Sequence, residues 1–145
     1  MKLEFELVPD GCWGYNLRSV LTKEGWDEVR KAAYARAKGR CMICGAPAYR
    51  LEAHEVWSYS VTNGRGAQKL ENVIAVCNAC HAVIHIGRTQ LKGDVRAAEE
   101  HYMRVNKVSY AEYRKALGEA NRRHGELNKV SEWSFDLSRL KEFLP

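Results

Sequence analysis

Four of the five cysteines in this chain form two C-x2-C pairs, and this pattern restricts the fold more than any other feature of the sequence. The pairs are Cys41–Cys44 and Cys77–Cys80, with 32 residues between them. Four thiolates give a tetrahedral zinc ion a closed coordination shell that has no open position for catalysis. The sequence therefore predicts a structural Zn²⁺ site that joins two distant parts of the chain.

Three histidines accompany these cysteines. His81 and His85 are four residues apart on a helix predicted from about Asn78 to Gly87, so their imidazoles share one face of it. His54 lies on a predicted strand over residues 48–57. Any one of these histidines could simply pack or cap. Three that converge predict a second metal site, with room in its coordination shell for water and a phosphate oxygen.

Composition and charge leave the class of partner open. The 145 residues are 46% hydrophobic and 28% charged, which is ordinary for one globular domain. No run approaches the roughly 18 to 20 apolar residues of a membrane span, and the first residues lack the apolar core of a secretory signal. We therefore expect a cytoplasmic protein with reduced cysteines and no membrane partner. The net charge of +5 is compatible with a polyanionic partner and does not demonstrate one.

Periodicity and turn signals predict the elements before and within the cysteine-rich region. Alternation over residues 2–8 predicts a half-buried strand. Thr22 is a suitable N-cap for a helix that ends near Lys38. Residues 58–68 contain an Asn-Gly turn signal and predict a loop, followed by a short strand from Asn72 to Val76. The apolar residues at helical spacing in the first helix, which we expect to be buried, are Trp26, Val29, Ala33 and Ala37.

The last third of the sequence predicts mostly helix. One helix is expected over residues 94–106, with Ala98, Tyr102 and Met103 facing inward. A capping box from Ser109 to Glu112 opens a second helix that runs to about Gly125. The tail over residues 131–137 alternates again and is expected to pair with the N-terminal strand or to wrap the core. The fold class is therefore α+β.

The region from residue 40 to 88, about a third of the chain, resembles the HNH endonucleases. The segments that carry the likeness are L-E-A-H-E, L-E-N-V-I-A-V-C and C-N-A-C-H-A-V-I-H. They follow the order of the family's ββα-metal motif, and the four cysteines resemble a zinc-containing subset found in phage and bacterial proteins. The resemblance implies a treble-clef core at 40–88 in a single domain, with an N-terminal extension over 1–39 and a helical C-terminal extension over 89–145.

The resemblance also implies a role for each motif residue. His54 falls on the first-strand metal ligand, and His81 and His85 fall on the helix ligands of a catalytic Mg²⁺, Mn²⁺, Ni²⁺ or Zn²⁺. Asn72 falls on the asparagine that fixes the hairpin and orients the catalytic base. Glu55 stands where the family usually has the base histidine. This glutamate is a departure from the family pattern. It matters because an ordinary glutamate has a pKa about two units below that of histidine and is a weaker base.

On this resemblance the chain is expected to be a hydrolase that cuts DNA, with basic residues that hold the flanking phosphates largely without reading sequence. The alternative is a catalytically weak or inactive zinc-stabilised nucleic-acid-binding or adaptor domain, which would need only the four cysteines. The resemblance is also compatible with a homodimer. It implies that the protein acts in a bacterial or phage-infected cell. The basic residues expected to contact nucleic acid are Arg36, Lys38, Arg40, Arg65, Lys69 and Arg88.

Overall fold

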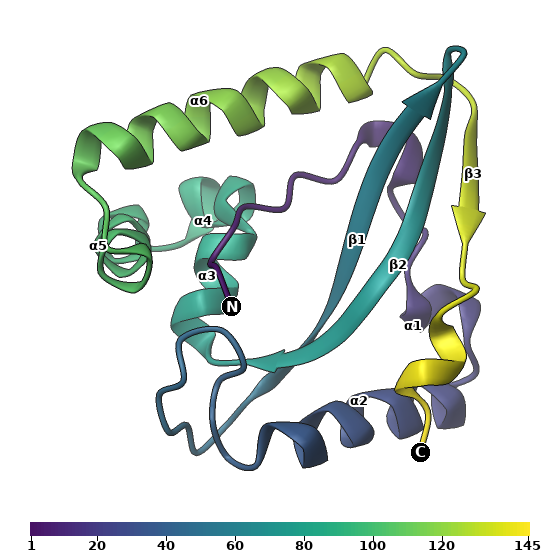
Figure 1. Ribbon diagram of the computed structural model, residues 1–145, viewed down its shortest axis with the longest axis horizontal. Coiled ribbons are helices and arrows are strands. Elements are labelled where there is room, and N and C mark those ends of the chain that lie inside the picture. Colours follow the sequence, from purple (N-terminus) through teal and green to yellow (C-terminus); the bar gives the residue numbers. More distant parts are fainter.

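The computed structural model describes residues 1–145 as a mixed α+β fold built around a three-stranded sheet. Strands β1 (Glu52–Thr62) and β2 (Arg65–Val76) form a long antiparallel hairpin, and β3 (Trp133–Asp136) adds to β2 in parallel. Figure 1 shows the hairpin as a twisted ribbon, with helices at both of its ends and along one side. The predicted α+β class is confirmed.

The hairpin is longer than the sequence predicted. The prediction of a loop over residues 58–68 is wrong. These residues belong mostly to the two strands, which continue to a two-residue turn at Asn63 and Gly64. These residues have φ values of 52° and 75°, the left-handed pair that matches the twist of a hairpin. The Asn-Gly signal thus located the turn correctly. The polar residues around it belong to strands whose backbone groups bond to each other rather than to water.

A bulge in β2 separates two parts of the hairpin. Val56 lies opposite Asn72 and Trp57 lies opposite Leu70, so Glu71 has no partner in β1. Such an extra residue bends the strand and increases its twist. The bulge lies close to the predicted site residues Asn72, His54 and Glu55.

One face of the hairpin is covered by α2 (Lys23–Ala37), which follows the short helix α1 (Leu17–Val20). The Thr22 side chain accepts a hydrogen bond from the Gly25 amide at 3.0 Å, which confirms the predicted N-cap. All four residues of the predicted apolar stripe are buried. They form a core with Leu17 and the C-terminal Phe143, packed on the β2 residues Leu70, Val73 and Ala75.

The opposite face is covered by the other helices. These are α3 (Asn78–Ile84), α4 (Ile86–Lys92), α5 (Val95–Asn106) and α6 (Tyr110–Leu127). The single helix predicted from Asn78 to Gly87 is in fact two helices that meet at His85. The predicted capping box of α6 is present, and Ala98 and Tyr102 are buried as expected. None of the helices has the length and apolar character needed to cross a membrane.

The N-terminal residues 2–8 do not form the predicted strand. The segment runs from the helices α3 and α4 towards the outer edge of β1 (Figure 1), ahead of a 3-10 turn at Asp10–Cys12. Alternation correctly indicated one buried residue, Leu3, but no strand lies beside it. The Asn106 side chain instead accepts a hydrogen bond from the Leu3 amide at 3.1 Å and donates one to its carbonyl at 2.9 Å. A side-chain amide therefore replaces the neighbouring strand.

The C-terminal tail pairs with β2 and not with the N-terminal segment, and it packs on the core as the second of the two expectations had it. Its Trp133 ring lies on Gly66, where an added Cβ would approach the ring to 2.5 Å. The chain then ends in a 3-10 turn at Leu140–Phe143 that packs against α2. The tail thus completes the core on the face opposite α3.

The bond between Asn106 and Leu3 can be tested by Asn106→Ala. The change leaves the buried backbone groups of Leu3 without partners, so we expect the free energy of unfolding to fall by about 1–3 kcal/mol in urea titrations. The matched control is Asn121→Ala on the exposed side of α6. This variant should change the free energy of unfolding by less than about 0.5 kcal/mol. Equal effects in both variants would contradict a structural role for this bond.

Candidate metal centres

The four cysteines Cys41, Cys44, Cys77 and Cys80 come together as one cluster, called here the four-cysteine cluster. Cys41 and Cys44 lie in a turn after α2, where Gly45 has a φ of 76° and its amide bonds the Cys41 carbonyl at 2.9 Å. Cys77 caps α3, and its thiol accepts a hydrogen bond from the Cys80 amide at 3.4 Å. The predicted pairing of the two C-x2-C motifs is therefore confirmed.

The spacing of these thiols fits a tetrahedral metal. Their four sulfur atoms all lie within 4.8 Å of one another, and Cys44 Sγ lies 3.8 Å from Cys77 Sγ. A tetrahedron with metal–sulfur bonds of about 2.3 Å has edges of about 3.8 Å. A disulfide would need about 2.05 Å, and all the cysteines are free. The four-cysteine cluster can therefore hold a metal ion.

The histidines His54, His81 and His85 form a second group, called here the three-histidine cluster. One nitrogen from each lies within 4.8 Å of the others. The ring centroids are 4.6 Å apart for His81 and His85, and His54 lies 5.3 Å from His85. His54 comes from β1, His81 from α3, and His85 from the junction with α4. The three imidazoles predicted to converge do so.

Two carboxylates that no sequence motif indicated contact this cluster. Glu6 Oε2 lies 2.9 Å from His54 Nε2, and Glu52 contacts His81 Nδ1. Carboxylates commonly orient metal-binding imidazoles in this way. Glu52 could have been found, because it lies two residues before His54 and so shares its face of β1. No local signal pointed to Glu6, which reaches the cluster only through the path of the N-terminal segment.

Burial favours the neutral form of two imidazoles in the cluster, those of His85 and His81. It lowers the pKa of His85 to about 3, with further contributions from His81, His54 and Arg88. Burial also lowers the pKa of His81, against the opposing effect of Glu52. A neutral imidazole is the form that binds a metal ion, so these residues are ready to act as ligands at neutral pH.

Glu55 lies on the other face of β1 from the three-histidine cluster. It is paired across the hairpin with Val73, which packs against α2, whereas His54 is paired with Ile74. Its carboxylate accepts a hydrogen bond from the Leu17 amide at 2.8 Å. Burial raises the pKa of Glu55, which makes it a stronger base than an exposed glutamate. Its role as the base stays a prediction.

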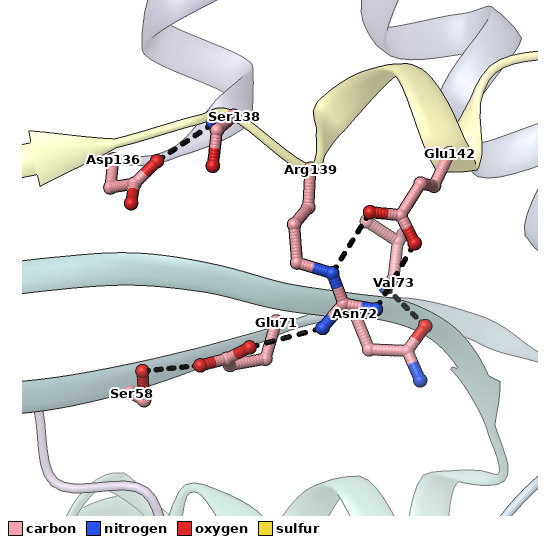
Figure 2. Close-up of polar contacts among 8 residues, drawn as sticks. All are labelled: Ser58, Glu71, Asn72, Val73, Asp136, Ser138, Arg139 and Glu142. Atoms are coloured by element: carbon pink, nitrogen blue, oxygen red, sulfur yellow. Dashed lines mark hydrogen bonds and ion pairs between the residues drawn. The ribbon is translucent and has the colours of Figure 1, made fainter.

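Asn72 lies on the same face as His54, opposite Val56. Its Oδ1 accepts a hydrogen bond from the Val73 amide at 2.8 Å, which fixes the backbone beside the bulge (Figure 2). The bulged residue Glu71 accepts a hydrogen bond from Ser58 at 2.7 Å and pairs with Arg139 at 3.0 Å. Residues of β1, β2 and the C-terminal tail thus hold this irregular part of the hairpin.

Several of the basic residues expected to contact nucleic acid have partners within the chain. Arg36 donates a hydrogen bond to the Val73 carbonyl at 2.9 Å, and Arg40 donates one to the Gly45 carbonyl at 3.1 Å. Arg65 pairs with Glu132 at 3.2 Å on the surface. These arginines therefore have structural contacts in addition to any contact with phosphate.

The other three differ in their surroundings. Lys38 ends α2 in a left-handed conformation and is exposed, and Lys69 is half-buried on β2. Arg88 is exposed on α4, and its charge contributes to the low pKa of His85. Arg88 is thus the member of the predicted set that lies beside the three-histidine cluster.

Searches against protein-family models, curated proteins and solved structures find no match for this chain.

The titration of His85 predicts that stability depends on pH. Its folded pKa of about 3 lies below an unfolded value of about 6.5, so only the unfolded chain gains this proton as the pH falls from 7 to 5. We expect this effect of His85 to lower the free energy of unfolding by about 2 kcal/mol between pH 7 and pH 5.

The measurement compares urea titrations at pH 7 and pH 5 for wild type and His85→Gln, each prepared with one zinc per chain. Any loss of zinc at pH 5 affects both proteins and cancels in the comparison. The variant should lose less stability than the wild type. An equal loss in both would show that His85 is not the residue responsible.

Proposed function

We propose that this chain is a metal-dependent DNA endonuclease of the HNH type. The observation that carries the proposal is the convergence of His54, His81 and His85 from a hairpin and the helix that follows it. This is the order of elements in a ββα-metal site. A closed set of four thiols next to an open set of three imidazoles also fits a division between a structural metal and a catalytic one.

The metal in the four-cysteine cluster is proposed to be zinc, since four thiolates at this spacing suit it. The turn with the first cysteine pair, the hairpin and the helix α3 then constitute a treble clef. The zinc would fix the first turn of α3, which carries Cys80 next to His81. The structural site would thereby position the ligands of the other site.

A divalent metal bound by the three histidines would polarise the scissile phosphate and stabilise charge on the leaving oxygen. The chain's own residues supply the rest. His54, His81 and His85 would hold the ion through unprotonated ring nitrogens, while Glu6 and Glu52 contact and orient two of the rings. With three protein ligands, the shell has room for a water molecule and a phosphate oxygen.

Glu55 is the proposed acceptor of the proton from the attacking water. Glu6 and Glu52 each contact a histidine ring, which leaves Glu55 as the nearby carboxylate with no such contact. Its raised pKa suits a base. Glu55 and the three-histidine cluster lie on opposite faces of β1, which is an edge strand of the sheet. Glu55 would therefore accept the proton through a bridging water molecule at the free edge of β1.

The alternative function is a zinc-stabilised nucleic-acid-binding or adaptor domain without activity. The position of Glu55 favours this alternative, since its carboxylate is held by the Leu17 amide on the side away from the histidines. Such a domain would retain the four-cysteine cluster and need no metal at the three-histidine cluster.

Cleavage of supercoiled plasmid tests the proposal directly. We expect purified protein to nick it with Mg²⁺, Mn²⁺ or Ni²⁺ and not with a chelator present. His85→Ala should slow nicking by about two orders of magnitude, because it removes a ligand of the charge-stabilising metal. Glu55→Gln should slow it by about a hundredfold, as loss of a general base does.

The matched control for the second variant is Glu100→Gln on the exposed side of α5, which should leave the nicking rate unchanged. Absence of metal-dependent nicking by the wild type under every condition would exclude the nuclease and leave the binding domain. Full activity of Glu55→Gln would exclude only its role as the base.

Arg88 is proposed to contact a backbone phosphate beside the metal. Arg88→Ala should weaken binding to DNA of any sequence and lower the salt dependence of the dissociation constant by about one phosphate contact. The measurement is fluorescence anisotropy with duplex DNA at several salt concentrations. Arg96→Ala, an exposed arginine on α5, is the control. A similar loss for both variants would indicate a general effect of charge instead of a specific contact.

A further inference from the structure

The four-cysteine cluster has a neighbour outside its ligand set. His101 lies on α5, its side chain is buried, and its Nε2 is 3.1 Å from Cys80 Sγ. His101 is not among the donor atoms that lie within 4.8 Å of one another in the cluster. It therefore contacts one ligand and does not complete the set.

Arg104 determines which way the hydrogen bond of His101 runs. An arginine Nη2 lies 3.2 Å from His101 Nδ1, and a guanidinium can only donate hydrogen bonds. His101 Nδ1 must therefore accept, and the ring proton must be on Nε2. This nitrogen then donates its proton to Cys80 Sγ.

Cys80 is the ligand that most needs such a donor. Its side chain is fully buried, and a zinc ion with four thiolates carries two net negative charges that water cannot reach at this position. The amides of Cys44 and Cys80 donate to the sulfur atoms of Cys41 and Cys77. Among the hydrogen bonds of the structure, the nitrogen partner of the Cys80 sulfur is His101.

We propose that Arg104 and His101 form a hydrogen-bond relay that stabilises the Cys80 thiolate of the zinc-loaded cluster and attaches α5 to it. His101 and Arg104 are positioning residues in this relay, because neither binds the metal. The positive guanidinium polarises the imidazole, and the imidazole passes this effect to the sulfur through its N–H group. The inference rests on the zinc-binding part of the proposed function and not on nuclease activity.

The relay predicts how fast zinc leaves the protein. Zinc-loaded full-length chain is mixed with an excess of the chelating dye pyridylazoresorcinol, and zinc release is followed by absorbance. His101→Phe keeps a ring of similar size and removes the donor, so release should be about tenfold faster. His101→Gln retains an N–H donor and should stay within about threefold of wild type. Arg104→Met should fall between wild type and His101→Phe.

A spectroscopic measurement separates this role from simple packing. In the Co²⁺-substituted protein, a hydrogen bond to a thiolate lowers the energy of the sulfur lone pair. Its loss should therefore move the sulfur-to-cobalt charge-transfer band to longer wavelength in His101→Phe and Arg104→Met. The matched control is Arg96→Met, an exposed change on the same helix, which should alter neither the release rate nor the band.

The outcomes are distinct. Release rates and cobalt spectra that match wild type in both His101→Phe and Arg104→Met would overturn the relay. If His101→Phe does not fold, the release rate and spectrum of Arg104→Met, a change at an exposed position, decide the matter. A wild-type chain that binds no zinc overturns the zinc site and the relay together. A chain that binds zinc and never cuts DNA contradicts only the nuclease proposal.

Discussion

The junction between β2 and α3 is the part of the structure on which both clusters depend. Cys77 caps the helix, Cys80 and His81 occupy its first turn, and His85 ends it. Adjacent residues on a helix point about 100° apart, so Cys80 and His81 can serve different clusters. A metal that holds Cys80 therefore also sets the direction of His81. The hairpin completes both sites, since β1 carries His54 and β2 leads directly to the helix.

Elements defined by short-range signals could be predicted from the sequence. The Thr22 cap, the Asn63-Gly64 turn and the capping box at Ser109 each depend on residues within one turn of each other, and each is present. Alternation is weaker evidence, because it indicates a buried face and does not identify a partner. Residues 2–8 alternate, yet their neighbours are helices and the Asn106 side chain, so no strand forms.

The same distinction applies to the two clusters. Much of each ligand set could be predicted because local geometry holds the two cysteines of a C-x2-C pair together and places histidines four residues apart on one helix face. The hairpin of β1 and β2 then joins the two cysteine pairs and adds His54. The residues that support the ligands could not be predicted, with the exception of Glu52. Glu6 lies 48 residues from its contact His54, and His101 lies 21 residues from its contact Cys80. They reach the clusters only when the N-terminal segment and α5 have packed. Contacts of this kind depend on the whole fold.

The carboxylates around the histidines set a condition on the proposed function. Glu6 and Glu52 contact the cluster directly, so in the absence of a metal the local charge opposes a phosphate even though the whole chain carries +5. A divalent cation offsets this charge, and Arg88 adds to its effect. On the proposed function, the metal would thus be needed for the phosphate to approach as well as for its hydrolysis. DNA that binds before the metal would be held by basic residues away from the histidines, without the scissile phosphate in place.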